Sequence, residues 1–385
     1  MAENGSRRIR LGMVGGGTGA FIGYVHRIAA RLDGDYDLVA GALSSRPDVA
    51  RESGRNIGLA DDRIYTSYEE MARAEAARPD GIEAVSIVTP NNVHFGPAKT
   101  FLEAGIHVIC DKPLTSTLDD ARALAAIKPK NGAKFLLTHN YTGYPLIRQA
   151  RELVKSGALG QLRIVQVEYP QDWLTEPADP NNKQAAWRTD PNQSGAGGAI
   201  GDIGTHAYNL ARFVSGLKTE ALAADLTTFV KGRQLDDNVQ ILLRFEGGAR
   251  GMLWASQVAV GNENGLKLRL YGDKGGLEWG QENPNQMWFS EFGKPRQRLT
   301  RGGSIASGAA AAPAMNIRVP AGHPEGYLEG FATLYAQFAE VIRGNGAPYE
   351  GLLPTLADGV EGMTFIAAAV KSSRENSRWV SFGEV

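Results

Sequence analysis

Short runs of apolar residues alternate with helical patterns along the first third of the chain. Ile22, Val25 and Ala29, for example, fall on one face of a predicted helix. Five of the apolar runs have the length and composition of buried strands, at residues 9–14, 36–43, 84–88, 106–110 and 135–138. Because strands that alternate with helices form βαβ units, residues 1–140 are predicted to form an α/β domain with a doubly wound parallel sheet.

Longer β runs replace this alternation after a predicted helix at residues 144–155. The runs lie at residues 162–169, 222–230, 239–245, 251–258 and 266–271. Since no helical patterns of comparable regularity separate them, residues 141–385 are predicted to form an α+β domain with a large, mostly antiparallel open sheet, for substrate binding and oligomerisation. A helix at about residues 355–373 is expected to pack back on the first domain.

Two long segments of the second half have the composition of loops, at residues 170–201 and 294–326. Loops of this length in compact domains are commonly functional. The first segment holds aromatic and hydrogen-bonding side chains suited to binding a sugar ring, namely Asp172, Trp173, Trp187 and Arg188.

The composition narrows the class of protein. A chain of 385 residues with 43% hydrophobic residues can bury two cores. Its 41 Lys and Arg residues balance 42 Asp and Glu residues, which excludes a strong electrostatic footprint for nucleic acid or an anionic membrane. Cys110 is the single cysteine, and no signal-peptide pattern or apolar stretch of membrane-spanning length is found. We therefore expect a cytoplasmic enzyme whose partner is a small molecule.

A glycine-rich loop follows the first predicted strand. Residues 15–20 match the G-x-G-x-x-A pattern between a strand and an amphipathic helix. Gly15 permits the tight turn, Gly17 lets a pyrophosphate approach the backbone, and Ala20 keeps the helix close to the strand. Together with Thr18, near the positive end of the helix dipole, these residues predict the binding of a dinucleotide.

The end of the second strand bears on which dinucleotide binds. The carboxylate that usually grips the ribose of NAD is absent there, and Ser44, Ser45 and Arg46 follow the strand instead. Their hydroxyls and guanidinium could accommodate a 2′-phosphate, which favours NADP(H). Alternatively, Arg46 stacks on the adenine or points to water, and the protein accepts both NAD(H) and NADP(H).

Lys112 lies within Asp111-Lys112-Pro113, where the fourth apolar run ends. Ligands bind at the carboxyl ends of the strands in an open parallel sheet, so this lysine is expected to point into the site. Its ammonium can hydrogen-bond an alcohol or carbonyl oxygen and can assist proton transfer beside hydride transfer. A solvated lysine in an ordinary turn is the alternative.

Asp202 and His206 are four residues apart at the start of a predicted helix that runs to Val214, and so share one face. A carboxylate beside an imidazole suits a general base that takes a hydroxyl proton near neutral pH. The alternative is an N-cap aspartate with an interior helix histidine. Zinc would need more ligands than one cysteine and this histidine provide, so no metal site is expected.

These motifs together resemble the Gfo/Idh/MocA oxidoreductase family over essentially the whole chain. They occur in the family's order: the glycine loop, Thr89-Pro90-Asn91 with His94, Asp111-Lys112-Pro113, and Asp202 with His206. The resemblance implies a Rossmann first domain, a lysine (Lys112) that polarises the reacting oxygen, an aspartate (Asp202) that binds substrate and supports it, and a histidine (His206) that acts as acid/base. It also places in the cofactor site Thr89, Pro90, Asn91, His94 and Asp111.

Two residues depart from the family pattern. Asp111 stands where the family usually has Glu, and Asn209 stands where it often has Asp. Asn209 keeps hydrogen bonding but loses a charge, so the substrates of the family do not transfer directly to this chain. Asn140 and Tyr141 follow the strand at residues 135–138 and are further candidates for substrate binding.

We therefore expect an NAD(P)-dependent oxidoreductase that transfers hydride between the nicotinamide and a secondary hydroxyl of a sugar, glycoside or inositol. Lys112 and His206 are expected to take part in proton transfer. A homo-oligomer, either a dimer or a tetramer, is expected to form through the antiparallel sheet. The alternatives are a sugar epimerase, transhydrogenase or glycoside-modifying enzyme that retains its cofactor, a non-catalytic dinucleotide sensor, and a scaffold protein.

Overall fold

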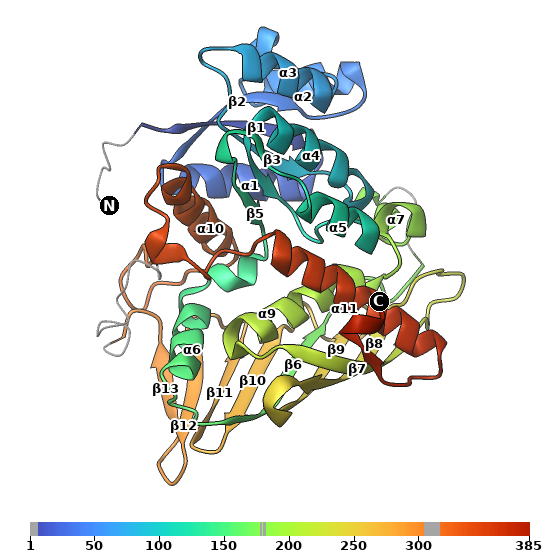
Figure 1. Ribbon diagram of the computed structural model, residues 1–385, viewed down its shortest axis with the longest axis vertical. Coiled ribbons are helices and arrows are strands. Elements are labelled where there is room, and N and C mark those ends of the chain that lie inside the picture. Colours follow the sequence, from blue (N-terminus) through green and yellow to red (C-terminus); the bar gives the residue numbers. More distant parts are fainter. Residues whose placement is uncertain (1–6, 178, 180–181, 304–315) are drawn as a thin grey trace. The chain divides into compact units, whose positions relative to one another are not determined.

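Two compact units make up the structure of the chain (Figure 1). The computed structural model describes residues 7–177, 179, 182–303 and 316–385. The first unit combines Met1–Thr115, Asp119–Gly143 and Tyr327–Val360, and the second combines Ser116–Leu118, Tyr144–Gly326 and Glu361–Val385. Within the described ranges, no helix has both the length and the apolar character needed to cross a membrane.

The first unit is built on a five-stranded parallel sheet with the strand order β2-β1-β3-β4-β5. The strands are β1 (Ile9–Gly15), β2 (Tyr36–Ala42), β3 (Ala84–Val88), β4 (His107–Cys110) and β5 (Phe135–Leu137). Each coincides with one of the five predicted apolar runs, which confirms the doubly wound α/β fold. The strand order reverses at β1, so ligands are expected at the carboxyl ends of β1 and β3.

Helices from both ends of the chain cover this sheet. They are α1 (Phe21–Leu32), α2 (Pro47–Asn56), α3 (Tyr68–Ala77), α4 (Phe95–Ala104), α5 (Leu118–Ala125) and α10 (Tyr327–Ile342). The last of them packs against α1 and buries Phe331, Tyr335 and Phe338 (Figure 1). The helix expected to return to the first domain, α11 (Leu356–Arg374), has its residues up to Val360 in the first unit and the others in the second.

The second unit is built on a nine-stranded sheet with the order β13-β12-β11-β10-β6-β9-β8-β7-β14. Neighbouring strands are antiparallel except β6 and β9, which are parallel, and this confirms the predicted, mostly antiparallel sheet. The strands are β6 (Leu162–Pro170), β7 (Thr219–Thr227), β8 (Asn238–Phe245), β9 (Arg250–Ser256), β10 (Lys267–Gly272), β11 (Gly275–Gly280), β12 (Gln286–Glu291), β13 (Gln297–Thr300) and β14 (Val380–Ser381).

Sequence patterns underestimate this second unit. They do not indicate β11 to β14, because β11 is rich in glycine, β12 and β13 carry polar residues, and β14 is two residues long. The prediction of a loop at residues 294–326 was wrong for residues 297–300, which form β13. Residues 304–315 of the predicted loop lie outside the described residues. The loop predicted at residues 170–201 contains two short helices, α7 (Lys183–Arg188) and α8 (Pro191–Ser194).

The two faces of the nine-stranded sheet differ. On one face, α9 (Thr205–Ser215) packs against β6 and β10, and α6 (Pro145–Lys155) packs against α9. On the other face, Leu242 of β8 lies opposite Met252 of β9, and both side chains are about half exposed, as is Ile164 of β6. This second face, opposite the one that α9 covers, therefore presents apolar groups on neighbouring strands.

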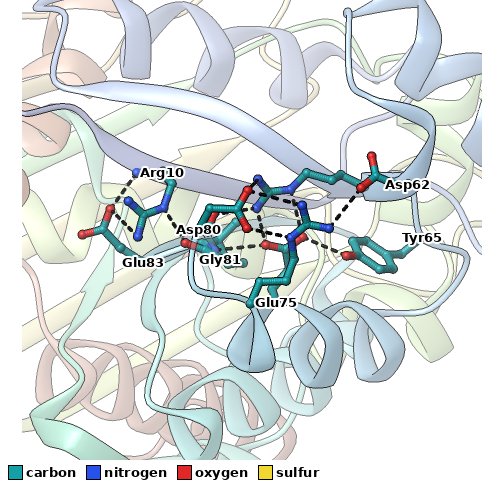
Figure 2. Close-up of polar contacts among 10 residues, drawn as sticks. Arg10, Asp62, Tyr65, Glu75, Asp80, Gly81 and Glu83 are labelled. Atoms are coloured by element: carbon teal, nitrogen blue, oxygen red, sulfur yellow. Dashed lines mark hydrogen bonds and ion pairs between the residues drawn. The ribbon is translucent and has the colours of Figure 1, made fainter.

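A buried ion pair stabilises the first unit between α3 and the segment that follows α2. Figure 2 shows Glu75 of α3 among donors from the segments around it. Nε of Arg63 donates a hydrogen bond to Glu75 Oε1 at 3.1 Å, the Tyr65 hydroxyl donates to the same oxygen at 2.8 Å, and the N–H of Ile82 donates to Oε2 at 3.0 Å. Glu75 and Arg63 are both buried, so each oxygen of the carboxylate is satisfied inside the protein.

Glu75→Gln should destabilise the fold, because it removes the buried counter-charge of the Arg63 guanidinium and leaves only the exposed carboxylate of Asp80, 3.5 Å away. We expect the free energy of unfolding to fall by about 3–5 kcal/mol, the cost typical of breaking a buried ion pair. Urea denaturation followed by circular dichroism measures the change. The control is Asp61→Asn, which breaks the exposed Arg55–Asp61 pair and should leave the midpoint unchanged. Equal midpoints for all three proteins would contradict the prediction.

Candidate functional site

The glycine loop between β1 and α1 has the geometry of an anion-binding turn. Gly15 (φ 79°) and Gly19 (φ 81°) adopt left-handed backbone conformations, and a Cβ atom on Gly19 would meet no other atom within 4 Å. Ala20 is the N-cap of α1 and makes no side-chain cap, so the first N–H groups of this 12-residue helix are available to an anion. The loop and the helix therefore fit the pyrophosphate of a dinucleotide.

Close packing around the loop involves Gly23 as well as Gly17. Ala20 is predicted to keep α1 near β1, but the close approach is made by Gly23, on which a Cβ would lie 2.4 Å from Gly16 Cα. A Cβ on Gly17 would lie 2.7 Å from the Leu43 carbonyl oxygen. The packing of the loop against the end of β2 therefore requires Gly17, whatever the loop binds.

Two further side chains form hydrogen bonds with the backbone of the loop, and no sequence pattern near the loop predicts these contacts. Nη1 of Arg27 donates a hydrogen bond to the Gly16 carbonyl oxygen at 2.7 Å, and burial lowers the pKa of this arginine. The N–H of Thr18 donates to Oγ of Ser53 on α2 at 3.0 Å. Thr18 and its neighbours are thus ordered by contacts with α1 and α2.

The residues after β2 place a guanidinium beside a carboxylate. Nη2 of Arg46 lies 2.8 Å from Asp48 Oδ2, and 72% of the Arg46 side chain is exposed. Oγ of Ser44 accepts a hydrogen bond from the Arg46 N–H at 3.1 Å, and Ser45 is exposed. The end of β2 thus has no acidic residue, but Asp48 lies in the first turn of α2. Asp48 pairs with the Arg46 guanidinium, which is the group predicted to bind a 2′-phosphate.

His94 joins the segment after β3 to the segment after β4. Its ring is fully buried, with Nδ1 2.8 Å from the Pro113 carbonyl oxygen and Nε2 2.9 Å from the Thr89 carbonyl oxygen. Burial lowers the pKa of this histidine. The ring therefore lies against the backbone at both strand ends, and in its neutral form it donates a hydrogen bond to one of these two carbonyl oxygens. Pro90 is half-buried and Asn91 buried within the segment that His94 holds.

Asp111 is held at the end of β4 by side chains from other elements. Its Oδ1 accepts a hydrogen bond from Thr138 Oγ1 at 2.9 Å and lies 3.8 Å from Nε2 of His26, on α1. Burial acts to raise the pKa of Asp111, but nearby His26 and the charge of Lys112 hold it well below its usual range. Lys112 therefore follows a carboxylate that stays ionised.

The segment after β5 contributes a buried amide. Asn140 and Tyr141 begin the 3-10 turn Asn140–Gly143 and are both buried. Within the part of the chain that the structure describes, Nδ2 of Asn140 has no hydrogen-bond partner. Burial, together with the charge of Lys112, lowers the pKa of the preceding His139 to about 3. A buried amide donor without a partner is uncommon, and a ligand contact would account for it.

Asp202 and His206, in the second unit, do not lie on one regular α-helix as the sequence predicts. Ile200–Gly204 form a π-helical turn that leads into α9, so Asp202 lies in the wider turn and His206 in the α-helix. A π turn follows from packing between distant segments and leaves no trace in the apolar spacing. Such turns are frequent at functional sites.

Asp236 anchors the start of this π turn. Its carboxylate accepts hydrogen bonds from the N–H groups of Gly198 and Ile200 at 2.7 and 2.8 Å. Burial raises the pKa of Asp236 to about 6. The backbone that carries Asp202 is thus held by a carboxylate from the segment before β8.

Asp202 is the centre of a polar and aromatic cluster in the second unit. Its Oδ2 accepts hydrogen bonds from Nε of Arg188 at 3.1 Å and from Nε2 of Gln257 at 3.0 Å. The guanidinium carbon of Arg188 lies 4.3 Å from the ring centroid of Trp187 and 5.9 Å from that of Trp173. The structure therefore brings four predicted site residues together and adds Gln257, which follows β9.

The remaining predicted residues of this unit have separate surroundings. The Asp172 carboxylate accepts a hydrogen bond from the Gly261 N–H at 3.0 Å and so stabilises a turn. The ring of His206 lies 6.4 Å, between centroids, from the ring of Tyr169. Asn209 lies three residues after His206 on α9. Its Oδ1 is buried and has no hydrogen-bond partner among the described residues.

Two family models match the chain. The model of the oxidoreductase family with an NAD-binding Rossmann fold matches residues 9–139, and the model of the GFO/IDH/MocA C-terminal domain matches residues 147–278.

Solved structures and curated proteins extend this similarity. An oxidoreductase from Sinorhizobium meliloti is 54% identical, with 97% of this chain and 100% of that chain covered and a TM-score of 0.87. An inositol dehydrogenase homologue from Azotobacter vinelandii, complexed with NADH and myo-inositol, is 38% identical with 98% of each chain covered and a TM-score of 0.89. Levoglucosan dehydrogenase of Pseudarthrobacter phenanthrenivorans is 29% identical over 73% of this chain and 76% of its own length. On this evidence, the chain belongs to the GFO/IDH/MocA family of NAD-binding oxidoreductases.

Proposed function

We propose that the protein is an NAD(P)-dependent dehydrogenase that acts on a secondary hydroxyl of a sugar, glycoside or inositol. The observation that carries the proposal is the position of Lys112, which follows β4 at the carboxyl edge of the same sheet whose β1 ends in the glycine loop. A dinucleotide at that edge supplies the hydride acceptor or donor. Relatives that include a myo-inositol complex and a levoglucosan dehydrogenase support the substrate class.

Three residues divide the proton chemistry in this proposal. Lys112 donates a hydrogen bond to the reacting oxygen and stabilises the negative charge that develops there during oxidation. His206 takes the hydroxyl proton as general base and returns it in the reverse direction. Asp202 binds the substrate and supports Lys112, and its carboxylate is oriented by hydrogen bonds from Arg188 and Gln257.

The substrate ring is assigned to the aromatic and amide groups of the predicted site. Trp173 and Trp187 provide faces on which a sugar or cyclitol ring can stack, and both flank the Arg188 guanidinium. The amide groups of Asn140 and Asn209 have buried atoms without a partner in the described residues, and ring hydroxyls can use them. We assign Tyr141 to the same role because it follows Asn140.

Lys112→Ala should lower kcat by about 10²–10⁴-fold, the usual contribution of a group that assists proton transfer, and should leave NAD(P)H affinity nearly unchanged. Formation of reduced nicotinamide is measured with inositols, sugars and glycosides as substrates, and cofactor affinity is measured by fluorescence. Lys99→Ala, at an exposed position of α4, is the control and should behave like the wild type. Retained turnover in Lys112→Ala would refute the catalytic role, and product formation without net reduced nicotinamide would favour an enzyme that retains its cofactor.

The preferred cofactor is proposed to be NADP(H), bound through Ser44, Ser45 and Arg46, with NAD(H) also accepted. Because Asp48 pairs with Arg46, it competes with a 2′-phosphate for the guanidinium. Asp48→Asn should therefore tighten NADPH binding by roughly fivefold, whereas Arg46→Ala should weaken it, and neither should change NADH binding by as much. Fluorescence titration of each reduced cofactor measures this. A strong NADH preference that Asp48→Asn leaves unaltered would contradict the proposal.

We also propose that the open face of the nine-stranded sheet joins copies of this chain in a dimer or tetramer. The half-exposed Leu242 and Met252 face the same side on neighbouring strands. Since a pair of buried lysines is costly at an apolar contact, Leu242→Lys should shift the protein towards the monomer in light scattering. Phe292→Lys, at an exposed position outside the strands, is the control. A wild-type protein that is monomeric at micromolar concentration would refute this proposal.

A further inference from the structure

One buried histidine, His26 of α1, has no role in the function proposed above. It is completely buried, and its ring packs against the rings of Phe331 and Tyr335 on α10 at centroid distances of 5.0 and 5.8 Å. Polar groups in such a position usually have hydrogen-bond partners, and the two ring nitrogens can differ in protonation. The two nitrogens of His26 face chemically different groups.

Nδ1 of His26 faces two hydroxyl groups. It lies 2.8 Å from the Tyr335 hydroxyl and 3.1 Å from Ser86 Oγ, and these two hydroxyls are 2.9 Å apart. Burial raises the pKa of Tyr335, so its hydroxyl keeps its proton. A hydroxyl that donates to Nδ1 leaves the proton of the neutral ring on Nε2.

Nε2 of His26 faces the Asp111 carboxylate. The distance to Oδ1 is 3.8 Å, which is too long for a hydrogen bond, and within the described part of the chain Nε2 has no hydrogen-bond partner. The same Oδ1 accepts the hydrogen bond from Thr138. Tyr335 and His26, which are buried, and Asp111, which is partly exposed, therefore form a series of polar groups that ends at the residue before Lys112.

We propose that His26 is a positioning residue for Lys112: with its proton held on Nε2 by Tyr335, it keeps the Asp111 carboxylate charged and in place. The kinetic part of this inference rests on the proposed function, because the role of Lys112 in the reaction belongs there. Without the positive end of the Nε2–H dipole facing it, a partly buried carboxylate gains a proton more readily. Lys112 would then lose the negative charge beside it.

Several titratable groups face Asp111 and influence the pKa of its carboxylate. Burial acts to raise the pKa of Asp111, but His26 and the charge of Lys112 lower it more, so it lies well below its usual range. His94 is already engaged by two backbone carbonyl groups. The groups around Asp111 are Cys110 and Lys112 beside it, His26 of α1, His94 before α4, His139 after β5, and Tyr335 of α10.

Carbon-13 NMR of the Asp111 carboxyl group tests the inference in the free protein, without cofactor or substrate. The resonance is identified by its absence from Asp111→Asn. In the wild type and in His26→Gln, whose amide N–H can replace Nε2–H, it should stay that of a carboxylate between about pH 8 and pH 5. In His26→Leu the resonance should titrate within that range, because leucine no longer opposes the effect of burial, which raises the pKa of Asp111. Identical titration of His26→Leu and the wild type overturns the inference.

The pH profile of activity gives a second readout. Between pH 8 and pH 6, kcat/KM of His26→Leu should fall by about tenfold more than that of the wild type, and His26→Gln should restore the wild-type profile. A loss that is equal at every pH and not rescued by Gln would indicate a structural role and overturn the inference. If His26→Leu does not fold, His26→Phe, which keeps a ring in the aromatic packing, replaces it under the same criteria. A wild type without any polyol-dependent activity would overturn the proposed function, and the NMR titration would still decide on His26.

Discussion

The partly buried carboxylate of Asp111, at the end of β4, is the constraint around which the polar groups of the first unit are arranged. A charge at the end of a buried strand is costly unless groups from other elements surround it. Here Thr138 donates to it and Lys112 follows it, while His26 faces it from α1. Groups from α1 and from the end of β5 thus surround a carboxylate that lies far from them in the chain. The glycine loop shows the same principle, because Arg27 and Ser53 order it from neighbouring helices and so reduce the entropy that a ligand must remove.

The predictability of each element followed from how it is buried. β3 is buried along its whole length and β4 along all but its first residue, so both form unbroken apolar runs that the sequence reveals. β11 and β12 are different, since glycine weakens the pattern of one and exposed or half-exposed residues weaken that of the other. The π turn before α9 could not be predicted, because Asp236 fixes its start from a distant segment.

The site residues divide in a similar way. Motif spacing and residue type predicted Asp202, Arg188 and two tryptophans as site residues, and contacts within the second unit bring these four together. Gln257 and His26 were not predicted, because each meets its carboxylate through a side-chain contact between elements that are remote in sequence. Asp48 was within two residues of Arg46, yet its importance depends on a side-chain pairing that the sequence does not specify. Local patterns therefore find groups with typical chemistry and miss the groups that orient them.

The return of the chain to the first unit at α10 constrains how the protein is made and how it can be recombined. Phe331, Tyr335 and Phe338 complete the core that α1 shares with the parallel sheet. A ribosome must therefore have synthesised most of the chain before the NAD-binding unit can close this core, and a fragment that stops at Gly143 would leave its apolar surface open. For the same reason, exchanging the second unit between relatives is an insertion with more than one junction in the chain, and a single fusion point cannot achieve it.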